Sequence, residues 1–166
     1  MTKDAVVALL VWASLIAAAL GDSPLTIGGL SLGMSPGQLS GDARKVLEKQ
    51  DRSDGVVVMH LASPDNPRSS DLSIWFQNQA AVKIEGHQLR HDDGILSQGA
   101  SEDECLKALG EPDKIEELTE AGCLAPKKVW SYEKPAGALS VIFGRTVENA
   151  PWLVRSFSVR AAGLKW

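Results

Sequence analysis

Alternating apolar and polar residues predict strands in two separate parts of the chain. In the first, Leu72, Ile74 and Phe76 are separated by Ser73 and Trp75. The second runs from residue 139 to residue 143 and has leucine, valine and phenylalanine at the matching positions. Successive side chains point to opposite faces of a strand. One face of each predicted strand is therefore wholly apolar and belongs against a core.

Other apolar runs, bounded by turn residues, predict further strands at 56–61, 81–85, 128–132 and 153–159. Each group of three strands follows a serine that begins a capping box: Ser35 with Gln38, and Ser101 with Glu104. The first predicted helix has its apolar face at Leu39, Ala43, Val46 and Leu47. The second has its apolar face at Cys105, Leu106 and Leu109 and ends at Gly110.

The two parts also match in residue order, which indicates an internal duplication. The block Leu30, Ser31, Gly33, Ser35 recurs at one spacing as Leu96, Ser97, Gly99, Ser101. The predicted strands recur at nearly the same spacing. We therefore predict an α+β fold of two tandem helix-plus-antiparallel-meander repeats, residues 25–90 and 91–160, forming one compact chain.

The first 24 residues differ from the rest of the chain. An uncharged, mostly apolar run at 5–20 follows a short head with Lys3 and precedes small residues, the layout of a signal peptide over residues 1–21. An uncleaved membrane anchor is the alternative, although the run is shorter than the roughly 20 residues that cross a bilayer. If this N-terminal segment is cleaved, we expect a periplasmic or secreted protein. If the segment is retained, we expect a membrane-anchored protein that faces the extracytoplasmic side.

Composition narrows the class of partner. Hydrophobic residues make up 44% of the chain and charged residues 23%, the balance of a folded globular protein. The net charge is -4 and the basic residues form no long run, so no nucleic-acid partner is expected. Contact with a membrane is expected only through the N-terminal segment, if that segment is uncleaved.

The chain has two cysteines, Cys105 and Cys123. In an oxidising compartment a single disulfide between them is the favoured interpretation. Closing that loop would stabilise the fold by roughly 3 kcal/mol. Two buried free thiols are the alternative. No histidine stands near either cysteine in sequence to act as its base, so a catalytic thiol is not expected.

Three short motifs resemble the BamE/SmpA (SmpA/OmlA) lipoprotein family: Leu32-Gly33-Met34-Ser35, Leu109-Gly110-Glu111-Pro112 and Trp130-Ser131-Tyr132. Tandem use of such a module is similar to the β-lactamase inhibitory protein family. The resemblance implies an extracytoplasmic protein that binds other proteins through its sheet. It also implies a disulfide within a repeat, which Cys105 and Cys123 would match.

The chain departs from that pattern in three respects. There is no lipoprotein cysteine beside the cleavage site, and the first repeat has no cysteine at all. Val58-Met59-His60 stands where the first repeat would have its Trp-x-Tyr strand. Membership of the fold is therefore better supported than the function of any one member.

Two segments offer candidate chemistry for an enzyme. Gly29-Leu30-Ser31-Leu32-Gly33 has the spacing of a nucleophile elbow, which requires a large parallel sheet that this chain is too short to build. His87 and His91, with nearby acidic residues, offer metal ligands, but Gly86 and Gly94 bracket them and favour a solvated loop. No phosphate-binding or dinucleotide motif is present. We expect no catalytic residue, no metal and no cofactor.

The sheet carries the more informative signal. If the apolar faces lie under the helices, Trp75 and Ile142 point to the opposite face among serines. Large apolar side chains on a polar face are typical of a contact surface. Coverage by a chain tail, such as Leu164 and Trp166, is the alternative. Trp130 and Tyr132 share one face and are candidates for the same surface.

The hypothesis from the sequence is an exported, non-enzymatic protein-binding module. It would bind another protein through the open face of its antiparallel sheets at Trp75, Ile142, Trp130 and Tyr132. Envelope assembly and enzyme inhibition are both possible uses of such a face. The alternative is a small metal-dependent or hydrolytic enzyme that uses Ser31 or the junction of His87 and His91.

Overall fold

The structure is a computed structural model that describes residues 25–41, 44–63, 66, 68–92, 94–118, 126–135, 137–147 and 149–164. It is mostly β-sheet, with 57% strand and 10% helical residues. The predicted α+β fold of two helix-plus-meander repeats is therefore wrong. The predicted signal peptide or anchor lies outside the described residues. In the part that is described, no helix is long and apolar enough to cross a membrane.

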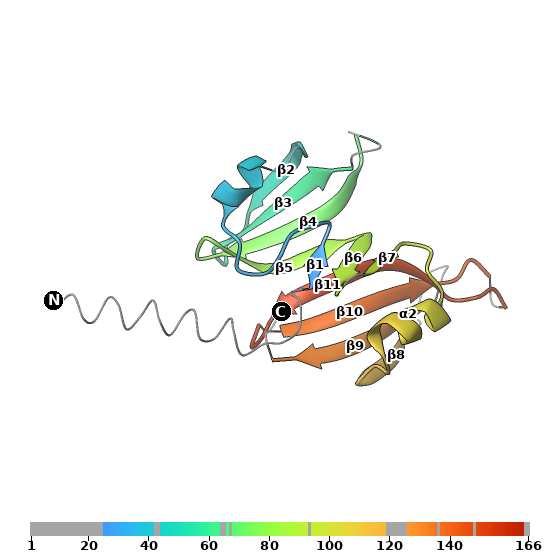
Figure 1. Ribbon diagram of the computed structural model, residues 1–166. Helices are drawn as coiled ribbons and strands as arrows, with labels where there is room; N and C mark the ends of the chain where they lie inside the picture. The colour runs from blue at the N-terminus through green and yellow to red at the C-terminus, as the bar shows by residue number, and fades with distance from the viewer. Residues whose placement is uncertain are drawn as a thin grey trace.

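Eight antiparallel strands form the main sheet, in the order β2-β3-β4-β5-β11-β10-β9-β8. The first half consists of β2 (Val46–Asp51), β3 (Val56–Ala62), β4 (Ser70–Gln77) and β5 (Ala80–Gly86). The second half consists of β8 (Lys114–Leu118), β9 (Lys127–Lys134), β10 (Gly137–Gly144) and β11 (Leu153–Ala161). Each half is a four-stranded meander, and the halves join where β5 pairs with β11 (Figure 1).

A small second sheet lies where the halves meet. It contains β1 (Thr26–Ile27), β6 (Gln88–His91) and β7 (Gly94–Ser97), in the order β1-β6-β7. The loop predicted around His87 and His91 is thus mainly a hairpin of β6 and β7. The predicted repeat boundary, between residues 90 and 91, falls inside β6. The duplication itself stays a prediction.

The second predicted helix is confirmed as α2 (Glu102–Leu109). The Ser101 hydroxyl accepts a hydrogen bond from the Glu104 backbone N–H at 3.3 Å. The Glu104 carboxylate accepts one from the Ser101 backbone N–H at 2.7 Å. Both halves of the capping box are therefore formed. The three acidic residues of the first turn also suit the positive end of the helix dipole.

The first predicted helix is wrong beyond its first turns. Only a short 3-10 helix forms, η1 (Pro36–Gly41), and Val46 and Leu47 begin β2 instead. Gly37 and Gly41 each disfavour helix by about 1 kcal/mol relative to alanine. Ala43, another residue of the predicted face, lies outside the described residues.

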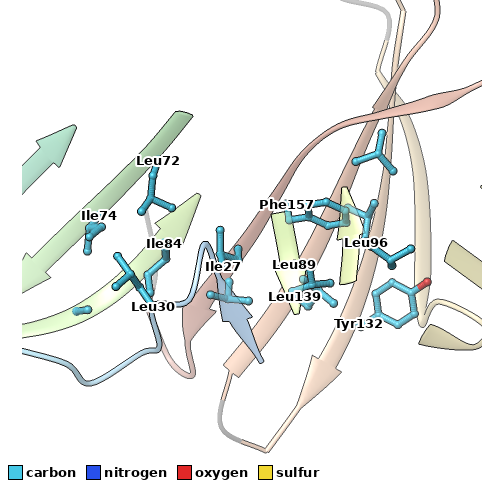
Figure 2. Packing of buried hydrophobic residues seen from close by; sticks show 14 of the residues in the cluster. Ile27, Leu30, Leu72, Ile74, Ile84, Leu89, Leu96, Tyr132, Leu139 and Phe157 are labelled. Atoms are coloured by element: carbon cyan, nitrogen blue, oxygen red, sulfur yellow. The ribbon is translucent and has the colours of Figure 1, made fainter. Parts of the chain in front are cut away.

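One core joins both sheets and both helical elements. The alternating residues of β4 and β10 are buried as predicted: Leu72, Ile74, Phe76, Leu139, Val141 and Phe143. Figure 2 shows Ile27 and Leu89 of the small sheet between core residues of the first half and of the second half. Leu39 of η1 and Cys105 of α2 complete the cover of this face. The small sheet and the helical elements thus cover one face of the main sheet.

Candidate functional site: the open face of the main sheet

The face of the main sheet opposite the core is here called the open face. η1, the small sheet and α2 all contribute their buried residues to the cluster on the other side. No helix or strand among the described residues lies over the open face (Figure 1). Its side chains are identified by the register of the strands, since directly opposite residues point to the same side.

A polar row crosses all eight strands of the open face. Each of its members is directly opposite the next: Glu48, His60, Ser73, Glu85, Ser158, Ser140, Ser131 and Lys114. His60 Nδ1 and Ser73 Oγ are 2.8 Å apart and share a hydrogen bond. Four of the eight members are serines, and three of these are consecutive: Ser158, Ser140 and Ser131. The face therefore has low relief and several hydroxyl groups on this side of Glu85.

A second row, the tryptophan row, runs beside the polar row. Its members are Gln50, Val58, Trp75, Lys83, Arg160, Ala138 and Glu133. Trp75 is half-buried. Lys83 Nζ lies 4.2 Å from the centre of the Trp75 ring, a cation–π contact. The same Nζ lies 3.1 Å from Glu85 Oε2. Lys83 thus holds the indole beside the polar row.

Ile142 also points to the open face, in the other half of the sheet. It is half-buried and stands opposite Val129 on β9 and Ser156 on β11. Trp75 on β4 and Ile142 on β10 are separated by roughly 14 Å across three strand spacings and by roughly 13 Å along the strands, because Ile142 is four positions from the residue of β10 in the row of Trp75. The two residues that the sequence placed on this face therefore flank its serine-rich centre.

Trp130 and Tyr132 do not belong to this surface. The register places them opposite Val141 and Leu139, on the core face, and both are buried. The Trp130 ring packs on Phe143 with 4.8 Å between ring centres. The Tyr132 hydroxyl donates a hydrogen bond to the Gly110 carbonyl at 3.2 Å, which ties β9 to the end of α2. Both residues are structural, and they are removed from the candidate contact surface.

Cys105 of α2 is fully buried and forms no disulfide with any of the described residues. Burial, followed by the negative charges of Glu104 and Glu102, raises its pKa to about 11. Such a thiol is inert as a nucleophile at neutral pH. Cys123 lies outside the described residues, so the disulfide stays a prediction.

In the described residues, neither of the two candidate enzyme sites, Ser31 and the junction of His87 and His91, has catalytic partners or metal ligands placed around it. Ser31 lies in an irregular segment, and every strand pairing among the described residues is antiparallel, whereas a nucleophile elbow follows a parallel strand. Within the described residues, no group of three or more histidine, cysteine or acidic side chains is placed to hold a metal. His91 ends β6, and His87 precedes that strand.

A cavity of about 350 Å³ lies at the start of β4, beside the small sheet. It is lined by Gly28, Arg44, Ser63, Asp71, Leu72, His87, Gln88, Ser97 and Gln98. The Arg44 guanidinium donates a hydrogen bond to the Gly28 carbonyl. Asp71 Oδ1 is buried and accepts no hydrogen bond from the described residues. The sequence did not predict this cavity, because six separate segments come together to form it.

Comparison with known protein families, with curated proteins and with solved structures finds no match for this chain. The resemblance drawn from the three short motifs therefore has no support beyond those motifs.

Proposed function

We propose that the protein binds another protein through the open face of its main sheet. The observation that carries this proposal is a continuous sheet of eight strands with one face packed against η1, the small sheet and α2, and no helix or strand over the other in the described part of the chain. A half-buried tryptophan and a half-buried isoleucine stand on that open face, where Val58 and Ala138 are buried among their neighbours. Tryptophan is the residue most enriched among binding hot spots.

The size of the face fits a protein partner. Seven strand spacings make the sheet about 34 Å wide, and a strand of seven residues is about 23 Å long, so the face covers about 800 Å². One side of a standard protein–protein interface buries about the same area. A small-molecule site would instead be concave and enclosed on most sides.

The relief of the face also favours a protein partner. Trp75 and Ile142 flank a centre of small side chains, among them Ser158, Ser140 and the buried Ala138. A convex surface of a partner can approach the backbone there, between two apolar anchors. The hydroxyl groups can both donate and accept hydrogen bonds to such a surface.

The proposed site of action lies outside the cytoplasm, either periplasmic or secreted, or membrane-anchored on the extracytoplasmic side. This part of the proposal is supported by the composition of residues 1–24. N-terminal sequencing of the protein recovered from its native cells tests it. A first residue between 20 and 24 supports export with cleavage, and an intact Met1 in the membrane fraction supports an anchor. An intact Met1 in the cytosolic fraction contradicts both.

The binding function is tested by a photo-crosslinking amino acid placed at Ser140, at the centre of the open face. The matched control position is Lys107, which is exposed on α2 on the covered side. The full chain is produced in its native cells and irradiated. We expect a discrete crosslinked species from position 140, its loss when Trp75→Ala is added, and no such species from position 107.

The urea midpoint of the Trp75→Ala variant, measured alongside, shows that the fold is retained. An equally strong adduct from position 107, or an adduct from position 140 that Trp75→Ala leaves unchanged, would contradict the proposal.

A further inference from the structure

The centre of the open face carries two cations in direct opposition. Lys83 on β5 stands opposite Arg160 on β11, at the junction of the two halves. Among the cross-strand pairs of the described residues, this is the only one with two like charges. Like charges directly opposite each other destabilise a sheet. The fold therefore retains an unfavourable pair at the middle of the surface proposed for binding.

The two cations differ in what surrounds them. Lys83 contacts the Trp75 ring at 4.2 Å and Glu85 at 3.1 Å, and its side chain is 25% exposed. Arg160 is exposed, and its guanidinium has no ion pair or hydrogen bond within the described part of the chain. Glu85 neutralises one of the two positive charges. Lys83, Glu85 and Arg160 together carry a net charge of one positive unit, which lies on Arg160.

Two serine hydroxyls lie near Arg160 on the open face. Ser158 is two positions away on the same strand, and Ser140 is opposite Ser158. The residue opposite Arg160 on β10 is Ala138, which has the smallest side chain of the tryptophan row and is buried. A group bound to the exposed guanidinium could therefore accept hydrogen bonds from these hydroxyls.

We propose that Arg160 and Lys83 recognise a carboxylate on a protruding loop of the partner protein, with Trp75 as the apolar contact beside it. This inference rests on the proposed function and adds the chemistry of the partner. A guanidinium binds a carboxylate through two parallel hydrogen bonds, which supplies both direction and strength. A single uncompensated charge suits one acidic side chain. A phosphate backbone would need a basic stripe, which an acidic chain with a net charge of -4 lacks.

The test uses a phage library of short random loops, each closed by a disulfide, selected on the full chain. The dissociation constants of the selected loop peptides are then measured on the wild type, on Arg160→Gln and on Trp75→Ala. Arg90→Gln is the matched control, because Arg90 is exposed on β6 and lies outside the open face. We expect enrichment of Asp and Glu in the loops. Arg160→Gln should weaken binding at least tenfold, Arg90→Gln should not change it, and binding should weaken as salt is raised.

A stability measurement accompanies the binding measurement. Removing one of two like charges should leave the urea midpoint of Arg160→Gln equal to or above that of the wild type. A clear fall in that midpoint would overturn the inference, because Arg160 would then have a structural role.

The outcomes separate the two proposals. Loops that lose binding in Trp75→Ala but show no acidic enrichment overturn the carboxylate inference and leave the open face as a binding surface. Loops whose binding is unchanged in Trp75→Ala contradict both. A short single-stranded DNA and an acidic peptide of the same net charge are also compared as competitors of the bound loops. If the DNA displaces the loops as well as the peptide does, the preference for a protein carboxylate is overturned.

Discussion

The two halves of the main sheet have the same strand plan but different covers. Both are four-stranded meanders, and each follows a serine that begins a cap. The second half is covered by a regular helix, α2, whereas the first has only the short η1. The caps differ in sequence: acidic residues follow Ser101, whereas Pro36 and Gly37 follow Ser35. Local helix propensity, rather than the plan of the sheet, decides how each half is covered.

The halves also differ in their ionisable groups. Cys105 on α2 and Tyr132 on β9 are buried together in the second half, and each has a raised pKa. Burial is the largest cause for both, and the Cys105 charge is the next cause for Tyr132. Residues 25–90 contain neither a cysteine nor a tyrosine. Alkali should therefore act on these two groups in the second half alone.

The largest expected effect compares the two core phenylalanines at matching positions. Phe143→Ala and Phe76→Ala should each lower the free energy of unfolding by about 3–5 kcal/mol, because both rings are buried. Phe143 also packs on the Trp130 ring, so its loss should cost about 1 kcal/mol more. Urea denaturation of both variants gives the comparison. A larger loss for Phe76→Ala would show that the first half holds the better-packed core.

The second prediction concerns alkaline stability. The Cys105 pKa is raised from 9.0 to about 11, so the unfolded chain loses this proton before the folded one does. The stability that this difference contributes is fully present below pH 9 and is lost as the pH rises towards 11. In Cys105→Ala the fall of the urea midpoint between pH 9 and pH 11 should be shallower than in the wild type. The same slope in both proteins would place the alkaline sensitivity elsewhere.

The third prediction compares the two caps. Ser101→Ala should cost about 1 kcal/mol at neutral pH, because it removes the hydroxyl that accepts from the Glu104 N–H. Ser35→Ala should cost less. There the Ser35 backbone N–H donates a hydrogen bond to Gln38 Oε1 at 2.6 Å, and an alanine can still make it. Equal costs measured by urea denaturation would mean that the two caps work alike.

The Ser101 cap also has a signature at acid pH. Hydrogen bonds from the Ser101 backbone N–H and hydroxyl lower the Glu104 pKa below its ordinary value of 4.5. The resulting stability is present above pH 4.5 and is lost as the pH falls through the lower pKa of the folded state. In Ser101→Ala the loss of stability below pH 4.5 should be smaller than in the wild type.

The smallest expected effect lies at the turn between β4 and β5. Gln79 has a φ of +64°, a region that a non-glycine residue occupies at a cost. Gln79→Gly should raise the free energy of unfolding by about 0.5–1 kcal/mol and gives the Asn-Gly pair that two-residue hairpins favour. Gln79→Ala is the control and should bring no such gain. A gain from alanine would mean that the side chain, rather than the backbone, is unfavourable there.

The strands that alternate apolar and polar residues were predictable, and those without alternation were not. All six predicted strands are confirmed, because one face of each is buried. β2 and β8 were missed, because they are exposed along their whole length and their sequences show no apolar face. Val46 and Leu47 fit the spacing of a helix face equally well, so the pattern alone could not assign them to β2.

The candidate site was predictable only in part, for a related reason. Alternation within β4 and β10 was enough to place Trp75 and Ile142 on the open face. The faces of Trp130 and Tyr132 depend on their pairing with β10, which a single strand does not reveal. The opposition of Lys83 and Arg160 depends on β5 meeting β11, which are far apart in the chain. Contacts of this kind follow from the assembled sheet and have no local signal.

The position of β11 has a consequence for synthesis. Among the described strands it is the last in chain order, yet it lies between β5 and β10 in the middle of the sheet. A growing polypeptide can form the first meander early, but the β5 edge has no neighbour until β11 has left the ribosome. A polypeptide truncated before Leu153 would carry two unpaired inner edges, and such edges join neighbouring molecules into aggregates. Loss of β11 should therefore be far more harmful than the removal of a single strand from the edge of the sheet.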